Sequence, residues 1–397
     1  MPSAYAMLAL MTQAQLGASV IQQGLGALAP FFATAYGLSH ASLGIAFAAL
    51  AAGSATTTAI SGVLVDRLGE RRVVLWSGLV VGLFTIFAGA WRNYAYLTCA
   101  LAAVGIGYGA STPAGGRAIL LWFERGRGFA MGVRQTGVPL GGAVGAILLP
   151  FVAVHFGYRG ALAVGGVIGA ATALFAYARY REPQGTKAEV RHTREIVSGM
   201  LDLAVQPRIV LLNLTGALLV STQYASVTFL SVYFIARHES LLLASTALAV
   251  FQLAAGLARL FWGMVSDRWF GGERTQPLIL LCILCALTLW WLSAMPAAAP
   301  AYNALAIAAA VGACCGGWNG LFSALQAEIG GVSAAGSALG VGLTYLYGTG
   351  IVAPPLFGAV VDHFGFALAW QALAIVVALG AIPAVLSRGM SPSSAAR

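Results

Sequence analysis

The sequence predicts an all-α integral membrane protein with twelve transmembrane helices in two pseudo-symmetric bundles of six. Composition predicts the class first. Of the 397 residues, 59% are hydrophobic and only 8% are charged, whereas soluble globular domains carry about 25% charged residues. The mean hydropathy of +0.85 points the same way. These values exclude a soluble enzyme, and we expect the chain to have no enzymatic activity.

Apolar runs long enough to cross a bilayer as a helix, about 20 residues each, follow one another between charged or turn-rich breaks. Twelve runs are predicted, at approximately residues 5–35, 42–65, 73–91, 96–123, 128–154, 158–179, 208–236, 241–265, 277–294, 302–326, 335–361 and 366–387. The longest polar stretch, from Arg179 to Arg208, divides them six and six. We therefore predict an N-terminal bundle over residues 1–180, a cytoplasmic linker over 181–207 and a C-terminal bundle over 208–397.

The loops predict the orientation, because cytoplasmic loops of membrane proteins carry an excess of Lys and Arg. With both termini cytoplasmic, 15 of the 21 Lys and Arg residues fall inside, three fall outside and three lie within the runs. We therefore expect a multi-pass protein of the cytoplasmic (inner) membrane. Because the positive charges form short clusters between apolar runs and not one solvated basic face, no nucleic-acid partner is expected.

The two halves repeat a short motif. GVLVDRLGERR, from Gly62 to Arg72, closes the second run, and GMVSDRWFGGER, from Gly263 to Arg274, closes the eighth. Their Asp66 and Asp267 are 201 residues apart, about half the chain. The same offset pairs Gln22 with Gln223 and Arg117 with Trp318. Paired bundles of this kind are typical of secondary transporters that bind substrate between two moving halves.

The pattern G-x-x-x-D-R-x-G-x-R-R at Gly62 to Arg72 resembles the loop between helices 2 and 3 of the major facilitator superfamily, and the second copy and the twelve runs extend the resemblance over nearly the whole chain. A carboxylate at a helix end can accept hydrogen bonds from a neighbouring helix N-terminus and pair with Arg. The resemblance implies a cytoplasmic gate made of Asp66, Arg67, Arg71 and Arg72, with Asp267 and Arg268 as its second copy. The alternative is that these residues only set the topology.

Three charged residues lie inside the predicted runs, and all three are arginines: Arg117, Arg134 and Arg259. A charge inside a membrane span is costly unless it faces water, a counter-ion or the bundle interior. Because no Asp or Glu lies inside any predicted run, we infer that the missing anion is the substrate.

The three arginines are not equivalent. Arg259, in GLARLFWGMVSD, resembles the helix 8 Arg of the oxalate/formate exchanger and monocarboxylate porter branch, which implies that it binds a carboxylate. Arg134 lies in the Gly-containing RQTG segment, which favours a place in the cavity. Arg117 has two readings of equal weight, a substrate contact or a structural one, because it shares a helical face with Glu124 and can extend toward the interface.

Polar and aromatic residues predict the rest of the pathway: Gln22, Gln223, Tyr224, Trp318, Asn319 and Tyr345. In the superfamily that the chain resembles, helices 1, 4, 7 and 10 line the cavity. Each residue taken singly could equally serve in hydrogen bonds between helices. A separate set of glycines at four- or five-residue spacing, Gly132, Gly137, Gly141 and Gly145, predicts close helix packing.

The sequence therefore predicts a secondary active transporter that moves a small organic anion, a carboxylate, by alternating access, as proton symport or anion exchange. No G-x-x-x-x-G-K-[ST] loop for ATP occurs, and we expect no cofactor and no metal. The alternative is an efflux pump for drugs or other lipophilic small molecules. We expect a monomer in the lipid bilayer whose partners are the anionic substrate and, in the symport version, protons. The five His residues are expected to be solvated.

Overall fold

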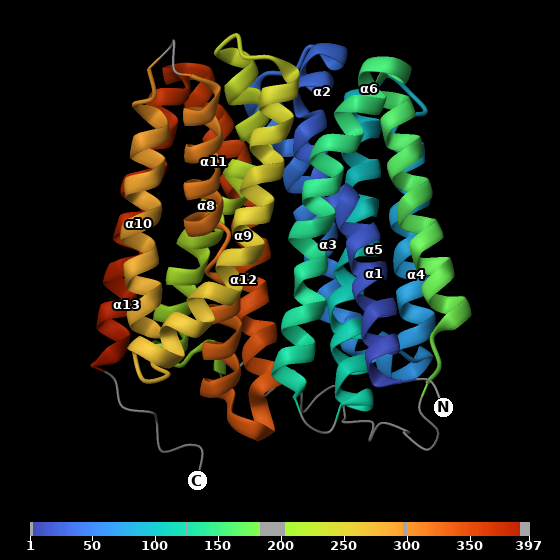
Figure 1. Ribbon diagram of the computed structural model, residues 1–397, viewed down its shortest axis with the longest axis vertical. Helices are drawn as coiled ribbons and strands as arrows, with labels where there is room; N and C mark the ends of the chain where they lie inside the picture. Colours follow the sequence, from blue (N-terminus) through green and yellow to red (C-terminus); the bar gives the residue numbers. More distant parts are fainter. Residues whose placement is uncertain (1–2, 124–125, 183–202, 297–299, 390–397) are drawn as a thin grey trace.

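The computed structural model describes residues 3–123, 126–182, 203–296 and 300–389, without the side chains of residues 59, 62, 63, 66, 128 and 330–337. Nearly all of this part of the chain is helical (Figure 1). The N-terminal bundle contains α1 (Ala4–Gln22), η1 (Gly24–Leu28), α2 (Ala29–Tyr36), α3 (His40–Leu68), α4 (Glu70–Ala88), α5 (Tyr94–Trp122) and α6 (Arg127–Arg179). The C-terminal bundle contains α8 (Pro207–Ala236), α9 (Leu241–Trp269), α10 (Thr275–Ser293), α11 (Ala301–Cys315), α12 (Asn319–Leu379) and α13 (Ala381–Arg388).

The described residues contain ten helical runs that are long and apolar enough to cross a membrane. Two of these runs, Phe129–Arg179 and Ala338–Arg388, have 51 residues each, which at about 1.5 Å per residue is more than twice the roughly 30 Å thickness of a bilayer core. Each contains a glycine with positive φ, Gly157 at 70° and Gly365 at 80°, a conformation that suits glycine because it has no Cβ. Division at these two glycines gives twelve segments, as predicted.

The two bundles stand side by side in Figure 1, and they meet where α3 packs against α12 and α6 packs against α9. We call the end at which α1 begins and α13 ends the lower end, and the opposite end, where α2 lies, the upper end. Near the upper end the backbones of α3 and α12 approach so closely that a Cβ on Gly44 would overlap the carbonyl of Pro354. A Cβ on Gly358 would likewise overlap the carbonyl of His40.

Glycines also allow α6 to pack tightly against α1, because helices in a membrane associate through small residues. A Cβ on Gly137, Gly141 or Gly145 would collide with the α1 backbone or the residue that follows it, which confirms the packing role predicted for these three. Gly132 differs, since no atom of the described residues lies within 4 Å of the position of its Cβ. The prediction of close packing was therefore wrong for Gly132.

Large apolar side chains cover the outside of the helices, as expected where the solvent is lipid. Trp76, Phe156, Leu257 and Trp269 are among the exposed ones. The polar side chains that are buried lie instead between the helices, many of them on α1, α3 and α8. The interior of the molecule is thus where the functional groups gather.

Candidate functional site

The strongest candidate site in the N-terminal bundle is the network around Arg134 of α6, a side chain that is only 1% exposed. Its Nη2 donates to Oε1 of Gln15 on α1 at 2.7 Å and to the carbonyl of Ser111 on α5 at 2.9 Å. Gln15 in turn donates through Nε2 to the hydroxyls of Tyr108 at 3.1 Å and Ser19 at 3.3 Å. Two neighbouring helices, α1 and α5, therefore hold one buried guanidinium of α6 through neutral partners.

The guanidinium of Arg134 is only partly satisfied. Its Nε and Nη1 have no hydrogen-bond partner among the described residues, and no carboxylate in that part of the chain pairs with it. The group lies against the backbone of α5, where a Cβ on Gly115 would overlap its Nε, Cζ and Nη2. A buried charge without a counter-ion costs several kcal/mol, so the two nitrogens without partners make Arg134 a candidate anion-binding residue.

The matching candidate in the C-terminal bundle is Arg259 of α9, whose side chain is partly buried. Its Nε donates at 3.3 Å to the carbonyl of Gly316, in the break between α11 and α12. Asn319 donates through Nδ2 to the same carbonyl at 3.2 Å and to Oε1 of Gln223 on α8 at 2.9 Å. The interrupted helix thus leaves the Gly316 carbonyl available to accept from side chains. A break of this kind near the midplane is common in transporter binding sites.

The two arginines share one neighbour, Tyr108 of α5. The Tyr108 hydroxyl lies within electrostatic range of both Arg134 and Arg259, and Tyr224 of α8 and Tyr347 of α12 lie within the same range of Tyr108. The network of each bundle therefore reaches the interface with the other. Tyr108 thus lies near two cations and two further tyrosines, and N–H and O–H donors of this kind suit an anion.

The remaining residues predicted to line the pathway fall into different environments. Gln22, at the end of α1, has a buried Oε1 with no partner among the described residues. Trp318 is fully buried, donates to the carbonyl of Cys315 at 3.0 Å and packs edge-on against Phe322. Its contacts are those of a core side chain.

Tyr345 lies apart from both arginines. It lines an apolar crevice of about 660 Å³ between α8 and α12, together with Leu214, Gly348, Val352 and others. Leu214 and Val352 are exposed on the outside of the bundle. The crevice contains no charged side chain, so it is not the site that the two arginines form.

Arg117 pairs with an acid that the sequence analysis assigned to a loop. Its Nη1 donates to the carbonyl of Val65 at 2.7 Å, and its Nε lies 3.6 Å from Oε2 of Glu70. Glu70 is only 2% exposed and accepts a hydrogen bond from Tyr180 at 2.9 Å. These contacts agree with the structural reading of Arg117, one of the two that the sequence left open. Glu124, the partner considered then, lies outside the described residues.

Most residues of the predicted gate lie at the lower end. The side chain of Asp66 is not among those described, and Arg67, Arg72 and Arg268 are exposed. Arg71 donates through Nε to the carbonyl of Tyr177 at 2.8 Å, and its Cζ lies 4.3 Å from the centroid of the Tyr177 ring.

In the second copy, Arg274 bonds Asp267 at 2.6 Å and Glu328 at 3.1 Å. Partial burial lowers the pKa of the Arg274 guanidinium, but its bonds to Glu328 and Asp267 outweigh burial and raise the pKa overall. The contacts of Arg71 and Arg274 each lie within one bundle.

Sequence reasoning missed several members of the site. Gln15 and Ser19 lie at helical spacing with Gln22 in the first predicted run, but nothing along the chain indicated that Gln15 contacts an arginine 119 residues away. Tyr108 and Tyr347 lie in apolar runs with no local signal. Only the three-dimensional arrangement identifies these residues.

Comparison with known proteins gives a family model and several relatives. The model described as Major Facilitator Superfamily matches residues 11–354. An uncharacterized MFS-type transporter of Mycobacterium tuberculosis is 31% identical over 374 residues, which cover 93% of this chain and 82% of the relative.

Shorter matches join the chain to named transporters. A probable sulfoacetate transporter of Cupriavidus necator is 29% identical over 35% of this chain and 33% of its own length. The 3-(3-hydroxy-phenyl)propionate transporter of Escherichia coli is 31% identical over 37% and 36%. Among solved structures, a bacterial homologue of the human lysosomal transporter Spinster has a TM-score of 0.78 at 15% identity and covers 99% of this chain and 100% of its own. That likeness concerns the fold alone.

Proposed function

The chain belongs to the major facilitator superfamily, and from that premise we propose that this transporter moves a small organic anion, a carboxylate, by alternating access of its two bundles. One observation carries the proposal. Arg134 and Arg259 lie in membrane-spanning helices of different bundles, and neither has a carboxylate partner among the described residues. The substrate supplies the negative charge that the site lacks.

Each residue has a definite task in this proposal. Arg259, which is less buried and has only its Nε hydrogen-bonded within the described residues, offers its two terminal nitrogens to the carboxylate as a bidentate donor. Arg134 adds positive potential and the N–H groups of Nε and Nη1, which have no partner among the described residues. Asn319 and Gln223 hold the broken helix beside Arg259, while Tyr108 lies within electrostatic range of both cations. Gln22 is a further contact of this site.

The relatives support an organic anion as cargo. Two of the named relatives carry sulfoacetate and a phenylpropionate, which are anions built on a small organic body. We propose further that the lower end faces the cytoplasm of a bacterial cytoplasmic membrane, because Lys and Arg concentrate in the loops at that end. In this arrangement residues 1–180 and 208–397 are the two moving halves, and 181–207 is the linker.

Uptake in proteoliposomes tests the proposal. Labelled acetate, an aryl propionate, sulfoacetate and a dicarboxylate form the panel, and a neutral lipophilic dye represents the efflux alternative. We expect uptake of at least one anion, and a loss of about tenfold or more in Arg259→Ala, since truncating one partner of a buried charge pair costs about 2–5 kcal/mol. Arg388→Ala, which removes an exposed Arg at the end of α13, is the control and should leave uptake unchanged.

Two results would count against a carboxylate. Transport of the dye alone would favour the lipophilic efflux pump, and unchanged uptake of every accepted anion by Arg259→Ala would remove the charge argument. The same vesicles separate symport from exchange: an imposed pH gradient drives uptake in symport, whereas unlabelled anion inside the vesicles drives uptake in exchange.

A further inference from the structure

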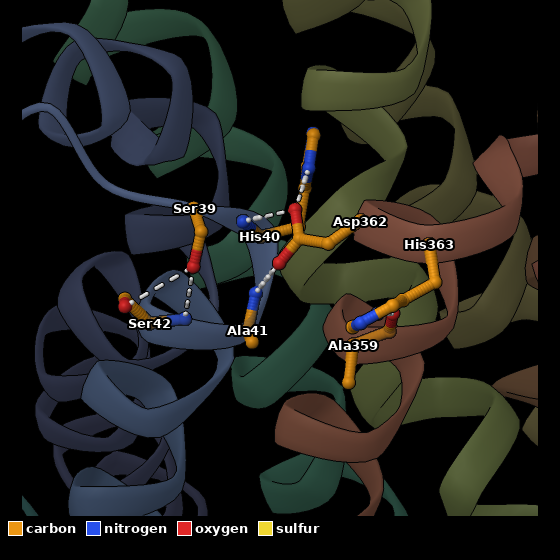
Figure 2. A network of polar contacts seen from close by, with 7 residues as sticks. All are labelled: Ser39, His40, Ala41, Ser42, Ala359, Asp362 and His363. Atoms are coloured by element: carbon orange, nitrogen blue, oxygen red, sulfur yellow. Dashed lines mark hydrogen bonds and ion pairs between the residues drawn. The ribbon is translucent and has the colours of Figure 1, made fainter.

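Asp362, near the upper end of α12, binds the first turn of α3 in the other bundle (Figure 2). Its Oδ1 accepts from the backbone N–H of His40 at 2.9 Å, and its Oδ2 accepts from the backbone N–H of Ala41 at 2.8 Å. Nδ1 of the His40 ring lies 2.7 Å from the same Oδ1. Because an ionised carboxylate only accepts, Nδ1 carries the proton in this contact. One side chain of the C-terminal bundle therefore receives three hydrogen bonds from the N-terminal bundle.

These contacts complete the N-terminal cap of α3. The first N–H groups of a helix have no partner within it, and the helix dipole makes that end positive. Within its own segment α3 is capped by Ser39, whose hydroxyl accepts from the N–H of Ser42 at 3.2 Å. The N–H groups of His40 and Ala41 are left for Asp362. The cap of α3 is thus shared between the two bundles and is complete only when they touch at this end.

The His40 ring also docks against aromatic side chains of the C-terminal bundle. It meets Phe366 edge to face at 5.2 Å between ring centroids and lies 6.5 Å from Phe229. Phe366 and Phe229 belong to a cluster with Tyr233 and Trp370. His40, expected from the sequence to be solvated, is instead part of a contact between the bundles. Among the described residues, the neighbouring His363 has one hydrogen bond, to the carbonyl of Ala359 in its own helix (Figure 2).

The sequence around Asp362 repeats the local pattern of the predicted gate. VDHFG places Asp362 three residues before Gly365, as VDRLG places Asp66 three residues before Gly69. Both glycines have a φ of 80°. Asp66 lies near the lower end of α3 and Asp362 near the upper end of the α12 segment that packs on it. The same helix pair therefore carries one such carboxylate at each end.

We propose that Asp362 is the gate residue of the upper end. Its carboxylate on the N-terminus of α3 holds this end of the substrate path closed, and the contact breaks whenever the transporter opens there. The inference rests on the alternating movement of the two bundles in the proposed function, but not on the chemistry of the substrate. Each hydrogen bond to a charged group changes the equilibrium between the states closed and open at the upper end by about tenfold or more. The loss of this contact therefore shifts the population toward the open state.

A buried cysteine reports the opening. Ser231 of α8 is 1% exposed and its hydroxyl has no partner among the described residues, so Ser231→Cys disturbs little. It lies one turn beyond Val227, whose carbonyl closely approaches Gly26 of η1 in the other bundle. The reporter is made in a Cys99→Ala background, because Cys99 is the exposed cysteine of the described residues. The rate of labelling by a water-soluble maleimide is then measured on the full-length protein in detergent, where membrane orientation does not matter.

In this background we expect Asp362→Asn to raise the labelling rate about tenfold. Asp362→Glu should restore much of the protection, since it keeps the charge. His363→Ala is the matched control, because the imidazole of His363 does not take part in the contact (Figure 2), and its labelling rate should equal that of the parent.

A second pair of variants tests the backbone part of the contact without touching Asp362. His40→Ala removes the imidazole and keeps the N–H, whereas His40→Pro removes both. Proline is favoured at the first position of a helix. Ser39, the residue before it, has a φ of −68° and a ψ of 164°, an extended conformation that suits the residue preceding a proline. We expect labelling to rise from parent to His40→Ala and again to His40→Pro.

Equal labelling rates in the parent, Asp362→Asn and His40→Pro would overturn the inference. If Asp362→Asn does not fold, equal labelling rates in His40→Ala and His40→Pro are enough by themselves to overturn the inference. The test is separate from the proposed function. If no anion in the uptake panel is transported but the labelling pattern is as expected, the anionic cargo is rejected and the gate is kept. If an anion is transported but the labelling rates are equal, the gate is rejected and the anionic cargo is kept.

Discussion

Gly115→Ala offers the sharpest test of the role of Arg134, because it moves the guanidinium without removing it. A Cβ at this position would overlap Nε, Cζ and Nη2 of Arg134. To reach ordinary contact distance the guanidinium has to move by about 1 Å or more. Its hydrogen bonds to Gln15 at 2.7 Å and to Ser111 at 2.9 Å then exceed hydrogen-bonding distance. The clash is with the end of a flexible side chain, so we expect the fold to survive.

Gly116→Ala is the matched control on the same turn of α5. The nearest atom to its added Cβ is Cε of Met131 at 3.6 Å, an ordinary contact. Both variants add one methyl group to adjacent positions and change helix propensity equally. Any difference between them therefore reports on Arg134.

The assay is uptake of an accepted anion in proteoliposomes, with KM and maximal rate measured separately. A displacement of about 1 Å in a charged binding group costs up to about 100-fold, so we expect Gly115→Ala to weaken transport by about tenfold to 100-fold, mainly through KM. Gly116→Ala should match the parent. Equal kinetic constants in the two variants would refute the idea that the position of Arg134 matters to the substrate.

Two further predictions concern the frame around the site. Gly358→Ala should force α3 and α12 apart, because its Cβ would overlap the carbonyl of His40, and it should raise labelling of the buried cysteine reporter; Gly348→Ala, whose Cβ would meet nothing within 4 Å, should not. Glu70→Gln should lower stability by about 3 kcal/mol, because it breaks a buried pair with Arg117. Glu328→Gln breaks an exposed pair and should cost below about 1 kcal/mol. Apparent melting temperatures in detergent measure both, and equal shifts would contradict the burial argument.

The fold was predictable because the signals for it are local. Membrane-spanning runs depend only on composition over about 20 residues, and the divisions at Gly157 and Gly365 fall where the sequence analysis ended one run and began the next. The intramembrane arginines were predictable for a similar reason, since a charge in an apolar run stands out without any knowledge of its neighbours. Arg117, Arg134 and Arg259 were identified on that basis, whereas the carboxylate-binding role of Arg259 was inferred from its resemblance to the helix 8 Arg of a transporter branch.

The direction in which a membrane helix presents its side chains was not predictable in the same way. A helix that is apolar all round gives no amphipathic pattern to show which face points inward. Tyr345 was therefore grouped with the pathway, although the structure places it in a crevice at the side of the bundle. Glu70 was assigned to a loop, although α4 begins at that residue and buries it. The position of Tyr345 and the burial of Glu70 each depend on the neighbouring helix, and the local sequence does not encode which helix that is.

The site architecture leads to one last prediction, about the empty transporter. Arg134 and Arg259 belong to different bundles and share Tyr108 as a neighbour, so closing the bundles without substrate brings two unpaired cations together in a medium of low dielectric. A bound carboxylate cancels part of this repulsion, and the loaded protein should therefore change state faster than the empty one. Efflux of labelled anion from proteoliposomes should then accelerate severalfold when unlabelled anion is present outside. Replacing one cation, in Arg134→Gln, should reduce this acceleration because the empty site repels less. An acceleration that is the same in the parent and in Arg134→Gln would show that repulsion between the two arginines does not limit the return of the empty transporter.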